Sequence, residues 1–492
     1  MSDRPDERLR LGRELVLERK FAPIERAGIS PGVARFRPRA APGQRNALPA
    51  VPEQYHFAEK LEPLELKNEA LAQLHVVFGG PGSGKSHFFM HVLRQLGEPQ
   101  SWEQPWGGLL LDPKGTLSRR VATEIPSAKT FVVGGASSHP VNLLRTHLAP
   151  HDLGVALALS AQAAGIGGSE PYWTNQLKLL FGSGLAAIQL LGGVPTLGAL
   201  ATMLLTSIQA TSNGRSRSVS ALGVMIERLN NAELDDVGRR RRARILAVLD
   251  PFEAAKGNNA DTTRSFIQQA LAPFLDPDLD ILSSEAATDS LADLIFRDGC
   301  WVVMDLPRTS LATSKFVATL VKVLFQQAAL ARHLIYPGQT RRVFMMIDEY
   351  AELGTDLPGE GFGDSIFFSQ MREFRILALI ATQGASMLKN SAVKDAWETI
   401  LTNSASKLVF KINDQETAEL ASKQVGERDF VAVESSSQRS SDGVSASSSR
   451  RIERKSEFAS GLFLGSLSRG QFAFLGSTDA VSAASVKFGR VV

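Results

Sequence analysis

The sequence contains a single cysteine, Cys300, among 492 residues. One thiol excludes an intramolecular disulfide framework and fits a reducing cytosol. No charge of one sign dominates, because 54 Lys and Arg stand against 51 Asp and Glu, which leaves a net charge of +3. Binding to nucleic acid would therefore have to come from local basic patches rather than from the overall charge.

Long hydrophobic runs are equally scarce. Residues 179–214 contain no Asp, Glu, Lys or Arg, but GGVPT at residues 192–196 breaks the run, and Gln, Thr and Ser recur within it. This pattern favours two helices of a buried hairpin over a membrane span. No segment before Leu74 is apolar enough to span a bilayer, and the charged first 20 residues are not those of a secretory signal.

The order of apolar runs along the chain predicts the fold class. A chain of 492 residues is too long for one compact core and suggests two or three domains. Short apolar runs that end in glycine-rich or acidic turns occur at 75–80, 107–115, 129–135, 300–306, 341–350, 375–383, 405–412 and 470–477. Such runs are typical of parallel strands buried on both faces. Residues 151–295 instead show helical spacing, so we predict an α/β domain with a mainly parallel sheet, interrupted by an inserted all-α domain.

The predicted divisions are a flexible N-terminal arm (1–55), the first part of the α/β domain (56–150), the all-α domain (151–295) and the second part of the α/β domain (296–492). Residues 1–50 hold 11 Lys and Arg against 6 Asp and Glu, a balance of +5. The arm is either a solvated tail or a segment that touches a partner or nucleic acid. Residues 434–451 are serine-rich and almost free of apolar side chains, which predicts a mobile loop within the second part.

A dense arginine run lies inside the predicted all-α domain. The stretch VGRRRRARILAVL holds five arginines within residues 239–244, and Glu233, Asp235 and Asp236 precede them. An acidic start and a basic continuation suit the dipole of a helix. The run fits a solvated helix face, a surface that docks a protein, or a contact with DNA phosphates.

The strongest motif is a phosphate loop. The stretch LHVVFGGPGSGKSHFF, which starts at Leu74, fits the pattern G-x-x-x-x-G-K-[ST] between an apolar strand and a helix. Lys85 is expected to neutralise the β- and γ-phosphates, and the Ser86 hydroxyl is expected to bind Mg²⁺. The residues expected to surround the nucleotide phosphates are Gly79, Gly80, Pro81, Gly82, Ser83, Gly84, Lys85, Ser86 and His87.

An acid pair follows a second apolar strand. In VFMMIDEYAELG the apolar run ends in Asp348 and Glu349, at the carboxyl edge of the sheet, where nucleotides bind. We expect Asp348 to hold Mg²⁺, directly or through water. We expect Glu349 to be the base that orients the attacking water.

Two further features point to the same chemistry. Gln383 ends the strand-like run RILALIATQ, where its amide is placed to sense the γ-phosphate or the water. Arg372 and Arg375 lie at or just before the start of that run. An arginine there can reach the nucleotide of a neighbouring subunit and stabilise charge in the transition state, although chemistry alone favours a surface role for either one.

The order of these motifs resembles one known family. After the phosphate loop come LLLDPKG, HPVNLL, PYWTNQLKLLFGSGLAAI, VFMMIDEYAELG, MREFRILALIATQ and TILTNSASKLVFKINDQETAELASKQVGE. Together they resemble the type IV secretion coupling proteins, the TraG/TraD-like ATPases of conjugation, over about residues 74–480.

The resemblance implies a RecA-like P-loop domain interrupted by an all-α domain and assembled as a hexameric ring around DNA, with ATP as the fuel. Lys85 and Ser86 then form the Walker A pair, and Asp348 and Glu349 the Walker B pair. Gln383 matches the glutamine of the third motif, and Arg372 matches an arginine that acts in trans. Asp112 and Lys114 match an element near the nucleotide, and Trp173 matches a tryptophan that opens the all-α domain, where it packs.

The sequence departs from the family at its start, because family members usually begin with transmembrane helices. The resemblance therefore implies a cytoplasmic motor that either works free or is held at the inner membrane by a separate protein. Its expected partners are DNA, a relaxase and channel components. Two rival interpretations remain, namely an FtsK/HerA-type translocase in DNA processing and a receptor that recruits protein substrates to a secretion channel.

Overall fold

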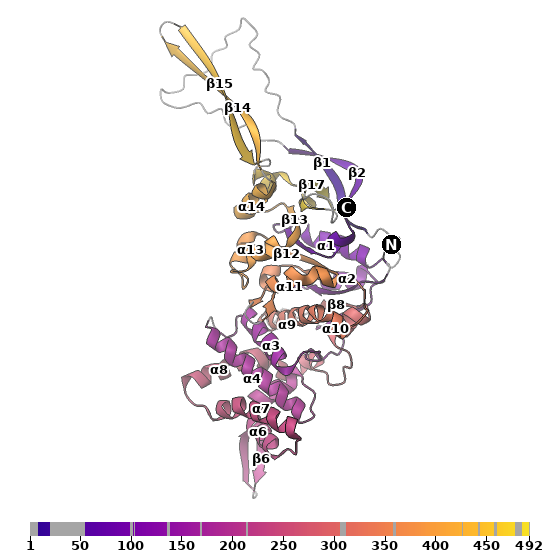
Figure 1. Ribbon diagram of the computed structural model, residues 1–492, viewed down its shortest axis with the longest axis vertical. Coiled ribbons are helices and arrows are strands. Elements are labelled where there is room, and N and C mark those ends of the chain that lie inside the picture. The colour runs from indigo at the N-terminus through magenta and orange to yellow at the C-terminus, as the bar shows by residue number, and fades with distance from the viewer. Residues whose placement is uncertain are drawn as a thin grey trace.

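The computed structural model describes residues 8–19, 55–98, 102, 104–134, 138–167, 170–212, 215–305, 311–357, 361–425, 427–440, 443–456, 460–477 and 485–491. Its centre is an 11-stranded sheet with the order β2-β1-β17-β16-β13-β3-β12-β9-β4-β8-β5. Below the sheet in Figure 1 lies a helical block, and a two-stranded ribbon projects at the other end of the molecule.

Seven neighbouring strands of the sheet are parallel. They are β13 (Ser404–Phe410), β3 (Leu74–Phe78), β12 (Ile376–Thr382), β9 (Val343–Ile347), β4 (Gly107–Leu111), β8 (Trp301–Met304) and β5 (Thr130–Val133). Most of them are buried along their whole length because helices cover both faces. The predicted α/β fold with a mainly parallel sheet is confirmed.

Helices on both faces complete two hydrophobic cores. On one face, α1 (Lys85–Leu96) and α2 (Thr116–Glu124) pack against inward-facing residues such as Val77 and Leu110. On the other face, α9 (Leu311–Leu330), α11 (Asp364–Gln370), α13 (Trp397–Thr402) and α14 (Gln415–Val425) pack against residues such as Val76 and Leu109. Adjacent residues of one strand therefore enter opposite cores, as the period of two in a strand requires.

In the sequence, the helical block lies between β5 and β8. It consists mainly of α3 (Pro150–Ala163), α4 (Pro171–Leu190), α5 (Leu197–Leu205), α6 (Ala221–Asn231), α7 (Asp236–Ala254) and α8 (Asn258–Leu271). Residues 153–161 of α3 are all buried, because α3 packs against α4 on one side and α9 on the other. This helix therefore joins the block to the sheet domain.

The block is not purely helical. The charge-free stretch 179–214 forms the end of α4 and all of α5, as expected, but the chain then enters a short ribbon of β6 (Ser207–Ser212) and β7 (Arg215–Ser220). Within the described ranges, no helix combines the length and the apolar character needed to cross a membrane.

The start of the chain contradicts the prediction of a flexible arm. Residues 8–19 form β1, which pairs with β17 (Ser485–Arg490) and with β2 (Tyr55–Lys67) at the antiparallel end of the sheet, next to β16 (Gln471–Gly476). Leu9 and Leu11 are buried, while Arg8 and Arg10 point outward. Alternation of buried and exposed residues is the period of a strand. The high charge of this segment suggested a solvated tail instead. The rest of the predicted arm that precedes Tyr55 lies outside the described residues.

Where a mobile Ser-rich loop is predicted at 434–451, the structure has two strands. Residues 427–440 form β14 and residues 443–456 form β15, paired antiparallel from Glu427↔Ser456 to Ser440↔Gly443. A composition without apolar residues excludes a packed core, but backbone N–H and C=O groups can form a ladder without one. Composition alone therefore misjudged the secondary structure here.

Candidate functional site

The phosphate loop lies where β3 ends and α1 begins. Gly82 and Gly84 adopt positive φ angles of 72° and 115°, which a residue with a side chain rarely adopts. The first N–H groups of α1 have no partner within the helix, so the positive end of a 12-residue helix faces the loop. Ser83 Oγ is buried without a hydrogen-bond partner among the described residues. The loop can therefore accept an anion.

Lys85 folds back onto the loop. Its Nζ donates to the carbonyl oxygens of Gly79 and Gly80, the latter at 3.3 Å, and the side chain is buried. Burial lowers the pKa of Lys85, while the negative charges of Glu349 and Asp348 act in the opposite direction. A phosphate would give this ammonium a better partner than two carbonyl groups.

Ser86 meets the acid pair. Its Oγ donates to Asp348 Oδ2 at 3.1 Å, across 262 residues of sequence. Asp348 follows β9 and is 2% exposed. Its backbone N–H donates to Leu111 O at 3.0 Å, and its Oδ1 accepts from the backbone N–H of Glu349. Ser86 and Asp348, the two residues predicted to bind a metal, are thus brought together.

Glu349 lies beside them in an unusual backbone conformation. Its φ of 51° and ψ of 50° are left-handed, a region that costs a non-glycine residue energy and is enriched at functional sites. The carboxylate accepts from Lys114 Nζ and from Gln383 Nε2, at 3.4 Å to Oε1 and 3.2 Å to Oε2. Gln383, at the end of β12, therefore contacts Glu349 directly.

Asp112 and Lys114 belong to the turn between β4 and α2. Asp112 accepts from the backbone N–H of Lys114 at 2.9 Å and of Leu117 at 2.7 Å, and from the Thr116 hydroxyl at 3.2 Å. Asp112 thus organises its own turn, while its charge adds to that of the acid pair. The Lys114 side chain reaches from this turn to Glu349, a contact that the sequence did not reveal.

The three carboxylates of Asp112, Asp348 and Glu349 oppose one another. Burial raises the pKa of Asp348, and the charges of Asp112 and Glu349 raise it further, while Lys85 and Lys114 act in the opposite direction. Among the described residues, no group of three or more His, Cys, Asp or Glu side chains could hold a metal ion. A metal here would have one hydroxyl and one carboxylate from the protein, which suits Mg²⁺ completed by phosphate and water oxygens.

Other side chains surround the outer side of the loop. An open depression of about 470 Å³ is lined by residues 80–83 and by Lys411, Asn413, Leu467, Ser468 and Arg469, among others. Gly80 N donates to Lys411 O at 2.8 Å, and Gly470 N donates to Ser83 O at 2.9 Å. Sequence reasoning missed Lys411 and Asn413, although they follow β13, a strand parallel to β3 that must end at the same edge. His87 is exposed on the first turn of α1.

Arg372 lies away from this site. It is exposed in the turn Met371–Phe374 that precedes β12, whereas Gln383 follows the other end of that strand. The seven residues of β12 separate the two positions by roughly 20 Å. Arg375 has a left-handed backbone and donates to Thr340 O at 3.2 Å. Neither arginine reaches the acid pair of its own chain.

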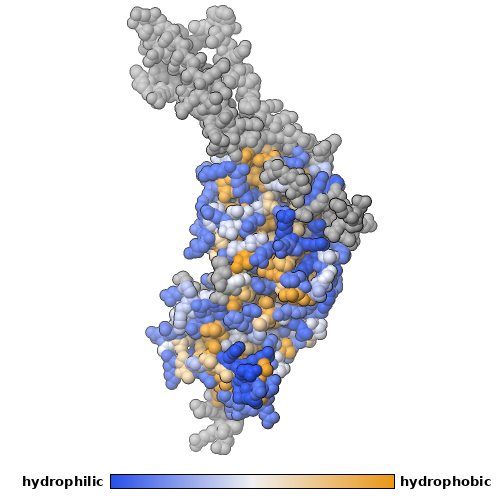
Figure 2. Space-filling view, viewed as in Figure 1, coloured by the Kyte–Doolittle hydropathy of each residue, from blue (hydrophilic) through white to orange (hydrophobic). Residues whose placement is uncertain are grey.

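Two arginines of the α7 run bond to groups within the helical block itself. Arg239 binds Leu234 O and Asp236, and Arg242 donates to the carbonyls that end α6. Arg240, Arg241 and Arg244 are exposed, and Figure 2 shows strongly hydrophilic surface over α6 and α7. Trp173 packs edge-on against Tyr172 and Phe266 within the block.

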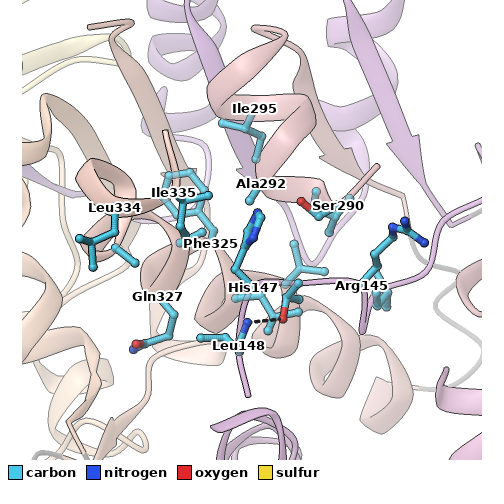
Figure 3. Close-up of a pocket in the computed structure, with 17 residues that line it drawn as sticks. Arg145, His147, Leu148, Ser290, Ala292, Ile295, Phe325, Gln327, Leu334 and Ile335 are labelled. Atoms are coloured by element: carbon cyan, nitrogen blue, oxygen red, sulfur yellow. Dashed lines mark hydrogen bonds between the residues drawn. The ribbon is translucent and has the colours of Figure 1, made fainter. Parts of the chain in front are cut away.

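A separate cavity of about 280 Å³ contains none of the predicted site residues. It lies between the segment that leads into α3, residues 290–295, and the C-terminal half of α9 with α10 (Arg332–Ile335) (Figure 3). Its wall is mostly aliphatic, with His147 and Ser290 among the few polar groups. This mostly aliphatic cavity does not suit a phosphate, whereas the loop at residues 79–86 does.

Comparisons with known proteins agree with the motifs. Residues 342–458 match the family model described as the TraM recognition site of TraD and TraG. The chain resembles the bacterial conjugative coupling protein TrwBdeltaN70 in an unbound form (15% identity, 87% of this chain and 86% of that chain, TM-score 0.58). It also resembles the plasmid coupling protein TrwB with ADP and Mg²⁺ (15%, 86% and 85%, 0.58) and with the ATP analogue ADPNP (14%, 86% and 86%, 0.58). No curated protein sequence matches. The predicted resemblance and the RecA-like fold are confirmed.

Because the pKa of Asp348 is raised, replacing this residue by the neutral asparagine is expected to stabilise the folded protein. In the folded state the Asp348 carboxyl keeps its proton to a higher pH than in the unfolded chain, where the pKa is near 3.8. The free energy of unfolding therefore falls as the pH rises from this value through the folded pKa. Asp348→Asn should therefore unfold at a higher temperature than wild type at pH 7 in metal-free, nucleotide-free buffer. The difference should vanish as the pH falls toward 3.8.

Asp112→Asn is the matched control for that experiment. Asp112 accepts three hydrogen bonds within its turn, so its substitution should lower stability at pH 7 by about 1 kcal/mol. Thermal unfolding followed by calorimetry at several pH values measures both effects. A loss of stability in Asp348→Asn at pH 7 would contradict this account of its charge.

Proposed function

We propose that this chain, which carries the TraG/TraD segment on the fold of the conjugative coupling proteins, is an ATP-hydrolysing motor that moves DNA for conjugative transfer. One observation carries the proposal. Lys85, Ser86, Asp348, Glu349 and Gln383 follow three neighbouring parallel strands and meet at one edge of the sheet. This set supplies an anion cradle, a metal site and a base, as phosphoryl transfer to water requires.

Binding of the nucleotide is assigned to the loop and α1. Backbone N–H groups of residues 79–86 would surround the phosphates, and Lys85 would exchange the Gly79 and Gly80 carbonyls for phosphate oxygens. Ser86 and Asp348 would hold Mg²⁺, as their hydrogen bond already aligns hydroxyl and carboxylate. Bound Mg²⁺ supplies positive charge that neutralises the phosphate oxygens. The likeness to TrwB structures with ADP and Mg²⁺ and with ADPNP supports this assignment.

Hydrolysis is assigned to Glu349. Lys114 and Gln383 hold its carboxylate at the mouth of the loop, where it can orient a water molecule and accept a proton from it. Lys114 also neutralises that carboxylate while no water is being activated. Gln383 links Glu349 to the end of β12, so a change at the γ-phosphate would alter the contacts at the end of that strand.

Arg372 is proposed to act on a neighbouring subunit. Its place at the opposite edge of the sheet rules out its own nucleotide, and an exposed guanidinium suits a contact between subunits. We propose a ring of six copies around DNA, in which Arg372 of one copy stabilises the transition state in the next. The helical block and the segment 342–458 would contact a relaxase complex, and the motor would deliver DNA to components of a secretion channel.

Glu349→Gln should bind ATP normally but turn it over at least about 10²-fold more slowly, because the amide cannot accept the proton of the water. The structure allows the substitution, since an amide can still accept from Lys114 and lie beside Gln383. Binding of a fluorescent ATP analogue and release of phosphate measure the two steps. Full activity in this variant would remove Glu349 from the mechanism.

Arg372→Ala should lower turnover by about 10³-fold or more while leaving nucleotide affinity in the isolated subunit unchanged. Arg375→Ala, a neighbouring arginine bound to its own chain, is the control and should retain activity. A mixture of Arg372→Ala and Glu349→Gln subunits separates the models. Action in trans predicts recovered activity, because sites with Glu349 then meet partners with Arg372, whereas action in cis predicts none.

A further inference from the structure

A fully buried ionic cluster lies directly behind the acid pair. Lys322 of α9 and Asp364 at the start of α11 have 0% exposed side chains. Lys322 Nζ donates to both carboxylate oxygens of Asp364 at 2.7 Å and to Thr355 Oγ1 at 2.9 Å. Gln326 Nε2 also donates to Asp364 Oδ1, at 2.7 Å. The ammonium and the carboxylate are therefore saturated by specific partners.

Tyr350 connects this cluster to the site. Its hydroxyl donates to Asp364 Oδ2 at 2.6 Å, and its ring is completely buried beneath Lys322 Nζ, 5.8 Å from the ring centre. Burial and the neighbouring Asp364 charge raise the pKa of Tyr350 well above its ordinary value, so the hydroxyl keeps its proton and remains a donor. Tyr350 is also the residue that follows Glu349.

Stability alone does not account for such a cluster. Removing two charges from water is expensive, and a well-packed apolar group of the same volume is often as stable or more so. The cluster lies in the largest hydrophobic core, next to Phe367 and Phe368, where apolar side chains would fit. What an ionic cluster adds is directional contacts, which fix one geometry.

The geometry that needs fixing is that of Glu349. Its left-handed backbone is strained and persists only where the surroundings hold it. The following residue is anchored at several points: the Tyr350 hydroxyl on Asp364, and the Tyr350 carbonyl, which accepts from Leu353 N at 3.0 Å and Gly354 N at 2.9 Å. Thr355 N then donates to Asp364 Oδ2 at 2.9 Å. Asp364 thus holds both ends of the segment 350–355.

We propose that the Lys322–Asp364–Tyr350 cluster is a positioning device that holds Glu349 in its left-handed conformation, with the carboxylate between Lys114 and Gln383. The cluster acts on Glu349 through Tyr350, so its residues are positioning rather than catalytic residues. The inference deepens the proposed ATPase function and rests on it.

Tyr350→Phe is the test variant, because it removes one hydroxyl and keeps the ring. Tyr336→Phe is the matched control, since the Tyr336 hydroxyl also donates to an aspartate, Asp293 Oδ1 at 3.0 Å, but in a part of the fold without contact to Glu349. Each variant loses one hydrogen bond to a carboxylate, which is buried for Tyr350 and part-buried for Tyr336. A purely structural role predicts a loss of thermal stability and no effect on kcat in either.

The positioning role predicts a split in the kinetics. Tyr350→Phe should lower kcat for ATP about tenfold with KM unchanged, because a loosened base is misplaced while the phosphate loop is intact. Tyr336→Phe should keep wild-type kcat. Combined with Glu349→Gln, Tyr350→Phe should cause no further loss of turnover, since it acts through the carboxylate already removed. An unchanged kcat in Tyr350→Phe, or an equal fall in both variants, would overturn the proposal.

Amide hydrogen exchange tests the cluster independently of hydrolysis. Peptides that cover residues 348–355 should exchange faster in Tyr350→Phe than in wild type, and at the wild-type rate in Tyr336→Phe. If the wild-type protein hydrolyses no ATP, the proposed function fails but the exchange comparison still decides whether the cluster holds this segment. Unchanged exchange in Tyr350→Phe would overturn the positioning role.

Discussion

The candidate site depends on the parallel pairing of β3, β12 and β9. Ala378 pairs with Leu74 and with Met345, so the three strands run in register and end at the same edge. That edge brings together Gly79, Asp348 and Gln383, which are up to 304 residues apart in sequence. Since each residue follows its strand directly, a shift of register would separate the phosphate cradle from the base and the metal-binding carboxylate.

The same convergence creates an electrostatic problem. Three carboxylates lie close together, and Asp112, Asp348 and Glu349 are all buried. In this structure the positive charges of Lys85 and Lys114 and the positive end of α1 offset them. Under the proposed function, Lys85 turns from the Gly79 and Gly80 carbonyls to the bound phosphates, while Lys114 keeps its contact with Glu349. The negative charges of Asp112 and Glu349, which raise the pKa of Asp348, would also favour a cation beside that carboxylate.

Much of the site could be predicted because its signals are local. The phosphate loop is a contiguous motif, and Asp348, Glu349 and Gln383 each follow an apolar run that reads as a buried strand. The sequence could not reveal the contacts that depend on distant pairing. Lys114 reaches Glu349 across 235 residues, and Asp364 has no periodic signal that marks it as the centre of a buried cluster. Likewise, the partner of β1 is β17, at the other end of the chain. Nothing local marks this pairing, and the charge of residues 8–19 therefore suggested a solvated arm.

The measurement that tests the central claim most directly is ATP hydrolysis by the purified protein with and without DNA, across a salt series. A motor that grips the phosphate backbone predicts strong stimulation by DNA at low salt, and this stimulation should fade as salt displaces the contacts. Hydrolysis that is indifferent to DNA at every salt concentration would contradict a DNA motor and favour a receptor for protein substrates.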